Sequence, residues 1–470
     1  MTIRLYDSRA QAVVDLTTLE PDRVGLYVCG PTVQSSPHIG HLRSALVYDQ
    51  WRRWLAHSGY DVTLVRNVTD IDDKILNAAA STGDPERWWA LAYRVELEFT
   101  AGYNALGILP PTYEPRATAY IAEMRDIIQR LIDGGHAYAA AGDVYFDTAS
   151  WPTYGELTRQ KPENMEAAAD ADPRGKRDPR DFAMWKGTKA HEPESASWPS
   201  PWGPGRPGWH IECSAMSRRY LGEAFDIHGG GLDLRFPHHE NELAQSTAAG
   251  DPFATYWVHN GLVNVNGQKM SKSLGNSVYA AELLAQTRPI VLRYFLGSAH
   301  YRSTIDFTDG SLAEAEASFG RIETFLTRVE RVLDGLPEGS AHDLPAAFSE
   351  AMDDDLNIPR ALAALHESIS LGNLELDSSA DLTLVAGFAR AVRAMTEVLG
   401  IYPFDPFWSM AGSDGTTQAL AALVEELLEA RVAARAAKNF TEADRIRDQL
   451  IAAGISIEDG ADRSHWSVQS

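Results

Sequence analysis

The sequence predicts an α/β fold built on a parallel sheet, and three consecutive segments near the N-terminus carry this prediction. Residues 24–28 are apolar and stop at Gly30-Pro31, which is typical of a strand that ends in a turn. Apolar side chains then recur at helical spacing as far as His57. Residues 61–67 (DVTLVRN) predict the next strand. A strand, a helix and a strand in succession form a βαβ unit, which implies a parallel sheet with ligands bound beyond its first strand.

The middle of the chain interrupts this pattern. Helical patterns cover residues 85–106 and 117–134. Residues 151–209 then contain nine prolines and five tryptophans, a proline density that argues against a regular helix or a central strand. We therefore expect an irregular, tryptophan-rich connection inside or beside the first domain.

The α/β pattern returns after this connection. Residues 224–228 predict a strand, the glycines at 229–231 a loop, and residues 238–248 a helix. The second half of a split domain is the simplest account.

The C-terminal part is predicted to be almost entirely helical. From about residue 311 onward the chain is rich in Ala, Leu and Glu at helical spacing. Asn357 followed by Ile-Pro is typical of a helix start, with Asn as the cap and Pro in the first turn. Residues 400–415 predict a linker, and two more helices and a short tail follow.

Composition places the chain among ordinary globular proteins. Its 470 residues, 44% hydrophobic and 23% charged, suffice for roughly two to four domains. The first twenty residues carry charges and no apolar run of signal length, and no segment approaches the roughly 18 uncharged residues of a membrane span. We expect a cytoplasmic protein that does not enter a membrane.

The charge balance limits the kinds of partner. A formal net charge of -23 argues against a general nucleic-acid binder, because affinity for phosphate backbones comes mainly from Lys and Arg. Residues 431–447 nevertheless carry five Lys or Arg side chains. A solvated helix face explains such an island equally well.

The two cysteines are too few for a disulfide framework, so metal ligation and plain burial compete as explanations. His238 and Glu242 are four residues apart on a predicted helix, and both project from one face. With Cys29 and Cys213 they make two thiolates, an imidazole and a carboxylate, all of which zinc accepts. Spacing alone leaves open a zinc site or two buried cysteines beside a His/Glu pair on a helix surface.

His38-Ile-Gly-His41 lies where the first predicted helix begins. Free backbone N–H groups and the positive end of the helix dipole suit a polyphosphate there. Gly40 lets a flat ring or a phosphate approach the backbone. Taken alone, this tetrapeptide is a weak signal.

Residues 267–276 (GQKMSKSLGN) form a second polar segment, predicted to be a loop. Its Lys269 and Lys272 carry ammonium groups that can stabilise a transferring phosphoryl group. A polar surface hairpin is the alternative. The chain's Gly-x-Gly-x-x-Gly match, residues 203–208, lies in the proline-rich connection where no strand is predicted, and no phosphate loop ending in Gly-Lys-Ser/Thr occurs, so neither a dinucleotide enzyme nor an ordinary phosphate-loop ATPase is supported.

The tetrapeptide at 38–41 and Lys-Met-Ser-Lys-Ser at 269–273 together resemble the two signatures of class I aminoacyl-tRNA synthetases. Four further motifs resemble the cysteinyl-tRNA synthetases in particular, and the resemblance runs from Arg4 to near Trp466. These motifs are YVCGPT at 27–32, NVTDIDDK at 67–74, WHIEC at 209–213 and HGGGLDLRFPHHENE at 228–242.

The resemblance implies a Rossmann-like catalytic domain split by an insertion, then an α-helical bundle and a small C-terminal anticodon-binding region. The expected domains are the first catalytic half at 1–119, the connective insertion at 120–204, the second catalytic half at 205–255, a linking region with the Lys-Met-Ser-Lys-Ser loop at 256–312, the bundle at 313–402 and the tRNA-binding region at 403–470.

The resemblance also implies the site residues. One zinc ion per chain would be held by Cys29, Cys213, His238 and Glu242. ATP, with Mg2+, would be bound by His38, Gly40, His41, Lys269, Ser271, Lys272 and Ser273, of which His38, His41, Lys269 and Lys272 act in catalysis. The cysteine pocket would comprise Cys29, Thr69, Trp209, His228 and Asp233.

Some of these positions have simpler explanations. Thr69 fits a turn, Trp209 a core, and His228 and Asp233 fit hydrogen-bonding members of a glycine-rich loop. Gln34-Ser35 stands where the family often has Tyr-Asp, which leaves any contact of those side chains undecided.

The implied reaction is the ATP-dependent ligation of L-cysteine to tRNA(Cys) through a cysteinyl adenylate, with zinc selecting the thiolate of the substrate. The expected partners are tRNA(Cys), ATP and L-cysteine, and the chain is expected to act as a monomer. A cysteine:aminosugar ligase of mycothiol synthesis resembles the same catalytic domain and is the first alternative. An inactive, zinc-stabilised tRNA-binding protein is the second. Residues 431–466 resemble the tRNA-binding end of the synthetase and discriminate against the aminosugar ligase.

Overall fold

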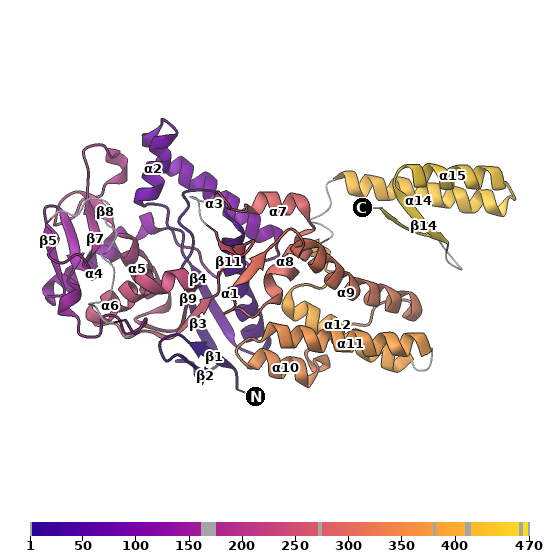
Figure 1. The fold of residues 1–470 in the computed structure, drawn as a ribbon, viewed down its shortest axis with the longest axis horizontal. Coiled ribbons are helices and arrows are strands. Elements are labelled where there is room, and N and C mark those ends of the chain that lie inside the picture. The colour runs from indigo at the N-terminus through magenta and orange to yellow at the C-terminus, as the bar shows by residue number, and fades with distance from the viewer. Residues whose placement is uncertain are drawn as a thin grey trace. The chain divides into compact units, whose positions relative to one another are not determined.

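The structure, a computed structural model, describes residues 2–160, 175–270, 275–378, 382–408, 415–459 and 464–468. The chain forms two compact units, Met1–Pro403 and Phe404–Ser470 (Figure 1). Among the described residues, no helix is long and apolar enough to cross a membrane.

A four-stranded parallel sheet lies at the centre of the first unit, as the βαβ pattern predicts. Its order is β10-β9-β3-β4, and each neighbouring pair is parallel. Their carboxyl ends meet at one edge of the sheet. The strands are β3 (Arg23–Val28), β4 (Asp61–Arg66), β9 (Ala224–Gly231) and β10 (Phe253–Asn260).

Helices cover both faces of this sheet (Figure 1). α1 (Ile39–His57) connects β3 to β4 and packs against α8 (Pro289–Ser298) on one face. α5 (Trp209–Leu221) and α6 (Glu240–Ala248) pack together on the other. The layered arrangement confirms the predicted α/β class.

The triple glycine at 229–231 belongs to β9, so the predicted loop is wrong. Gly229 to Gly231 pair with Val258 to Asn260 of β10. A Cβ on Gly229 would lie 2.3 Å from Cε1 of Tyr48 in α1. The Tyr48 hydroxyl donates to the carbonyls of Gly230 and Val258, at 2.8 Å each. Gly229 therefore permits close packing of α1 on the strand.

The insertion after β4 is more regular than expected. Three helices lead to an antiparallel sheet in the order β5-β6-β7-β8. The expectation of an irregular connection without a central strand is wrong for β7, because its segment FAMWKG contains no proline and is almost entirely buried. A proline prevents strand pairing only at its own position, where it cannot donate a backbone hydrogen bond. The proline in β8 lies in an edge strand, where this is tolerated. The elements are α2 (Asp73–Ser81), α3 (Trp88–Ala105), α4 (Ile121–Asp133), β5 (Ala137–Ala140), β6 (Asp143–Phe146), β7 (Phe182–Gly187) and β8 (Gly205–Pro207).

Two small sheets flank the parallel one. An N-terminal hairpin, which the sequence analysis did not identify, pairs β1 (Arg4–Asp7) with β2 (Ala12–Asp15). A second sheet follows β10, and its last strand leads toward the helical bundle. It comprises β11 (Val263–Val265), β12 (Gln268–Lys269) and β13 (Ile305–Phe307), with α7 (Ala280–Gln286) following β12 in the chain.

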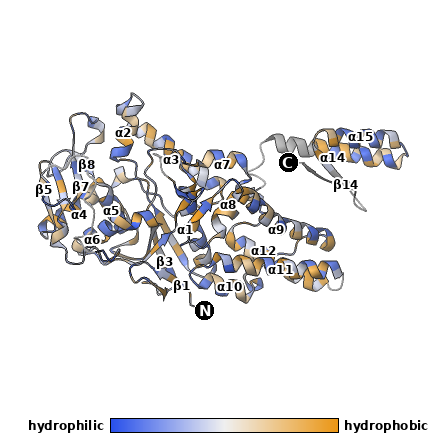
Figure 2. Ribbon diagram, viewed as in Figure 1, coloured by the Kyte–Doolittle hydropathy of each residue, from blue (hydrophilic) through white to orange (hydrophobic). Residues whose placement is uncertain are grey.

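The predicted helical bundle is confirmed. Its helices are banded with apolar and polar residues in Figure 2, as amphipathic helices should be. The backbone N–H of Arg360 donates to the Asn357 side chain at 3.3 Å, which supports the predicted cap. The bundle comprises α9 (Ser311–Leu333), α10 (Ala346–Asp353), α11 (Ile358–Ser378) and α12 (Leu382–Leu399).

The second unit contains the two helices predicted for the end of the chain, α14 (Gly415–Ala436) and α15 (Phe440–Ala452). The short tail is an antiparallel hairpin of β14 (Ile455–Asp459) and β15 (Ser464–Val468), which the sequence analysis did not anticipate. Val424, Leu428, Ile446, Leu450 and Ile455 form its core. Of the predicted linker, residues 409–414 lie outside the described residues.

Candidate active site

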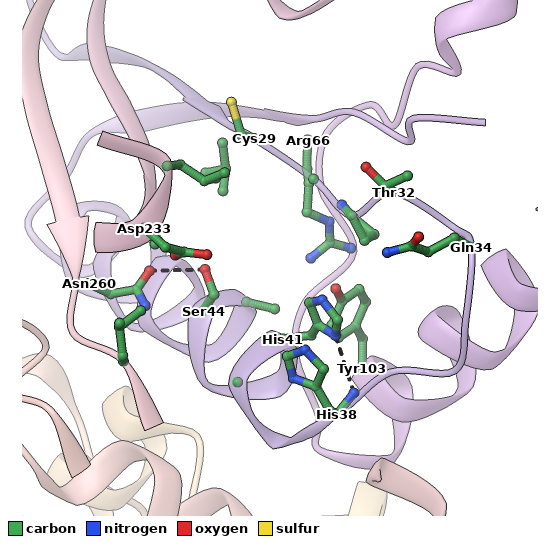
Figure 3. Close-up of a pocket in the computed structure, with 18 of the residues that line it drawn as sticks. Cys29, Thr32, Gln34, His38, His41, Ser44, Arg66, Tyr103, Asp233 and Asn260 are labelled. Carbon is green, nitrogen blue, oxygen red and sulfur yellow. Dashed lines mark hydrogen bonds between the residues drawn. The ribbon is translucent and has the colours of Figure 1, made fainter. Parts of the chain in front are cut away.

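A pocket of about 290 Å3 opens at the carboxyl edge of the parallel sheet (Figure 3). Cys29 follows β3, Arg66 ends β4, and Asp233 follows β9. The predicted site residues that line it are Cys29, His38, Gly40, His41, Trp209 and Asp233, and Gln34 and Ser35 line it as well.

Cys29 begins a cluster of four side chains behind this pocket. Its Sγ lies 3.5 Å from Sγ of Cys213 and 3.2 Å from Oε1 of Glu242. Nε2 of His238 lies 3.5 Å from Sγ of Cys213 and 3.0 Å from Oε1 of Glu242. The predicted metal set therefore converges from three separate segments of the chain.

Close packing of the backbone after β3 explains how Cys29 is brought into this cluster. A Cβ on Gly30 would lie 1.6 Å from the carbonyl oxygen of Asn67, so only glycine lets the chain leaving β3 pass the end of β4 this closely. The Gly30 N–H donates to Oδ1 of Asn67 at 2.8 Å. His238 lies in a wider turn that precedes α6, not inside the helix, yet keeps the predicted relation to Glu242.

The spacing of the four ligand atoms fits a tetrahedral metal ion. Zinc bonds of about 2.0–2.3 Å give a tetrahedron with edges of roughly 3.3–3.8 Å. The four donor atoms all lie within 4.8 Å of one another, and the four contacts above lie between 3.0 and 3.5 Å. The residues present therefore fit zinc by both geometry and donor type.

Electrostatics in the cluster also favour a cation. Burial opposes the charged form of Glu242, but His228 and His238 hold the pKa of this carboxyl well below its usual range. Burial opposes protonation of His238, and Glu242 and Cys213 raise its pKa to about 10. Burial raises the pKa of the Cys29 thiol, and contact with Cys213 raises it further. Ionisation of Cys29 is therefore opposed without a metal ion, whereas a divalent ion would hold both sulfur atoms as thiolates.

A second layer of imidazoles supports the cluster. His228 lies 2.8 Å from Oε2 of Glu242, which fixes the carboxylate that faces Cys29. Nδ1 of His239 lies 2.8 Å from Nε2 of His259, and Nδ1 of His259 lies 2.7 Å from Oγ of Ser8. Cys29, His228, His239 and Glu242 also qualify as a metal-binding group by distance. Sequence reasoning missed His239, although it directly follows His238, and no local signal points to His259 or Ser8.

The remaining predicted cysteine-binding residues lie at different depths. Trp209 and Asp233 face the pocket, whereas Thr69 and His228 are buried behind its wall. Thr69 Oγ1 donates to Oε2 of Glu212 at 2.7 Å. Burial raises the pKa of Glu212 well above its usual range. The Trp209 ring packs 4.1 Å from that of His238.

The predicted ATP-binding turn lies across the pocket from Cys29. His38 immediately precedes α1, and the rings of His38 and His41 stack with centroids 3.6 Å apart. His41 Nδ1 accepts from the His38 backbone N–H at 3.2 Å. A Cβ on Gly40 would lie 3.1 Å from the His38 ring, so glycine keeps this turn compact.

The lysine segment lies partly outside the described residues. Lys269 ends β12, is exposed, and does not line the pocket. Met270 lies 3.5 Å from where a Cβ on Gly40 would stand, so the described start of the segment reaches the turn before α1. Ser271, Lys272 and Ser273 lie outside the described residues.

Comparison with known families accounts for most of the chain. Residues 15–317 match the class I (C) tRNA synthetase catalytic domain. Residues 347–403 match the DALR domain, and residues 417–466 match the anticodon-binding domain of cysteinyl-tRNA ligase.

Individual proteins agree with this assignment. A cysteine–tRNA ligase of Leifsonia xyli subsp. xyli is 66% identical over 100% of both chains. Another, of Clavibacter michiganensis subsp. michiganensis, is 65% identical over 100% of this chain and 99% of its own.

Solved structures show the same fold at low identity. A methionyl-tRNA synthetase of Mycobacterium tuberculosis, in complex with methionyl-adenylate, is 16% identical with a TM-score of 0.56, covering 81% of this chain and 90% of that one. A LeuRS of Agrobacterium radiobacter K84 is 12% identical with a TM-score of 0.59, covering 85% and 86%.

Motifs, fold and full-length relatives thus agree, and the chain belongs to the cysteinyl-tRNA synthetases, the cysteine–tRNA ligases of class I.

Proposed function

We propose that the chain joins L-cysteine to tRNA(Cys) in two steps, through a cysteinyl adenylate, and selects cysteine at the cluster of Cys29, Cys213, His238 and Glu242. The convergence of these four donors behind the pocket carries the proposal. Membership of the cysteine–tRNA ligases supports the overall reaction.

Selection of the amino acid follows from donor chemistry. Zinc held by these four residues would supply a soft cation that prefers the substrate thiolate to a serine hydroxyl. Trp209 and Asp233 line the pocket and would enclose the substrate backbone. A pocket that reads size alone separates such similar substrates poorly, so ligation of sulfur would make editing unnecessary.

Adenylate formation would take place at the start of α1. The first-turn N–H groups and the rings of His38 and His41 would hold the triphosphate of Mg-ATP while the substrate carboxylate attacks the α-phosphorus and pyrophosphate leaves. Lys269 and Lys272 would stabilise the departing charge, with Gly40, Ser271 and Ser273 completing the ATP site. The terminal ribose hydroxyl of tRNA would then take the cysteinyl group and release AMP. No covalent nucleophile of the chain is required.

The aminosugar ligase would use the same adenylate but no anticodon-binding domain, and the match of residues 417–466 to that domain favours the synthetase. Incorporation of labelled cysteine into total tRNA tests both functions. The full chain is compared with a truncation ending at residue 403, where the first compact unit ends. We expect charging by the full chain, little by the truncation, and cysteine-dependent pyrophosphate exchange by both. Exchange without charging by the full chain would favour the aminosugar ligase, and absence of both would favour the inactive tRNA-binding protein.

A further inference from the structure

Arg66 ends β4 and lines the pocket, yet neither of the two signatures includes it. Its side chain is 9% exposed. In Figure 3 the guanidinium extends into the pocket between Cys29 on one side and His41 and Tyr103 on the other. Among the described residues, Lys74 is the other lysine or arginine side chain on the pocket wall, and Lys74 is exposed.

Two neighbours hold the Arg66 side chain in one orientation. Nε donates to Oε1 of Glu114 at 2.9 Å. The guanidinium carbon lies 4.2 Å from the centre of the buried Tyr103 ring, a distance typical of a cation–π contact. A guanidinium has five N–H donors, and its Nη1 and Nη2 groups donate to no partner among the described residues.

The ion pair between Arg66 and Glu114 is not needed to hold its two segments together, because backbone hydrogen bonds already do so. The Arg66 N–H donates to the Tyr113 carbonyl at 3.2 Å, and the Val68 N–H donates to the Pro115 carbonyl at 2.8 Å. These bonds hold the segment that carries Glu114 against the end of β4. A largely buried cation whose remaining donors face a pocket is instead suited to bind an anion.

The position of Arg66 indicates which anion. The proposed reaction places the substrate sulfur at the cluster beside Cys29 and the phosphates at His38 and His41. The carboxylate of the substrate must lie between these two places, because it attacks the α-phosphorus. We propose that Arg66 is the substrate-binding residue that holds the carboxylate of L-cysteine through Nη1 and Nη2. Planar paired donors match a carboxylate better than a lysine ammonium does.

This inference rests on the proposed function, and its test separates the two. L-cysteine binding to the metal-loaded full chain is measured first, since failure of the unaltered chain to bind it contradicts the proposed function. Binding of L-cysteine and of cysteamine, which has the thiol and amine but no carboxylate, is then compared. We expect Arg66→Gln to weaken L-cysteine binding about tenfold to a hundredfold and to leave cysteamine binding unchanged.

Arg116 provides a matched control. It pairs with Glu96, and its guanidinium lies 5.5 Å from the Tyr93 ring, but it does not line the pocket. Arg116→Gln should leave both affinities unchanged. Glu114→Gln keeps the cation but loosens its orientation. We therefore expect a smaller loss of affinity for L-cysteine and no change in affinity for cysteamine. Arg66→Lys should restore part of the loss, and these two variants keep the test valid if Arg66→Gln fails to fold.

Other outcomes overturn the assignment. If Arg66→Gln lost equal affinity for L-cysteine and for cysteamine, Arg66 would merely shape the pocket. An increase confined to the KM for ATP would show that Arg66 binds the α-phosphate instead. Unchanged pyrophosphate exchange with a raised KM for tRNA would assign it to a phosphate at the tRNA end.

Discussion

Arg293 of α8 and Asp49 of α1 form an ion pair with an Nη2–Oδ2 distance of 2.6 Å, and the two side chains are 1% and 0% exposed. Arg293 also donates to the Leu399 carbonyl at the end of α12, at 2.9 Å. One buried cation thus connects the helix that begins at the proposed ATP site to the end of the helical bundle.

Removing either partner should destabilise the first unit. Arg293→Ala leaves Asp49 buried with Arg53 as its remaining cation, and loss of one partner of a buried pair costs about 3–5 kcal/mol. Urea denaturation followed by tryptophan fluorescence measures the loss. Arg23→Ala, which breaks the exposed pair with Glu20, should change stability by less than about 1 kcal/mol. Equal effects of the two variants would contradict the importance of burial.

The same pair predicts a pH dependence. Burial opposes ionisation of Asp49, but Arg293 and Arg53 outweigh it and lower its pKa. A native-state pKa below the unfolded value of about 3.9 gives stability that is present above that pH and lost as pH falls through the native value. Asp49→Asn should therefore flatten the acid side of the stability curve. A slope below pH 5 equal to that of the unaltered chain would contradict this assignment.

Glycine positions predict opposite effects of the same substitution. Gly229→Ala should destabilise by about 1–3 kcal/mol, because its Cβ would overlap the Tyr48 ring. Gly320→Ala lies inside α9 with no atom near its Cβ and should stabilise by about 0.5–1 kcal/mol. Thermal unfolding of both variants measures the signs. Stabilisation by Gly229→Ala would show that α1 can withdraw from β9.

Metal removal should expose the cysteines to oxidation. Their sulfur atoms lie 3.5 Å apart, and a bound zinc ion would protect both from reagents. A chelator followed by the thiol oxidant diamide should give an intramolecular Cys29–Cys213 disulfide, whereas the zinc-loaded chain should keep two thiols. Mass spectrometry of peptides distinguishes the products. Equal oxidation of both forms would contradict a metal held by the two cysteines.

Several elements could be predicted because their signals are local. The apolar runs at 24–28 and 61–67 and the helical spacing between them identify β3, α1 and β4 within one or two residues. β7 could not be recognised, because its pairing with β6 connects segments separated by the proline-rich stretch. The strand at the triple glycine was missed because Tyr48, whose close approach requires Gly229, lies far away in the chain.

The sequence by itself determined the family and the donor types of the site, since both depend on which residues occur in which motif. Only the tertiary structure decided that Cys29, Cys213, His238 and Glu242 meet, that Thr69 and His228 are buried behind the pocket, and that Arg66 faces it. Convergence of this kind depends on how strands β3, β4 and β9 align and on glycines that let backbones pass closely. Spacing along a chain does not contain those distances, because folding brings together residues that no local pattern connects.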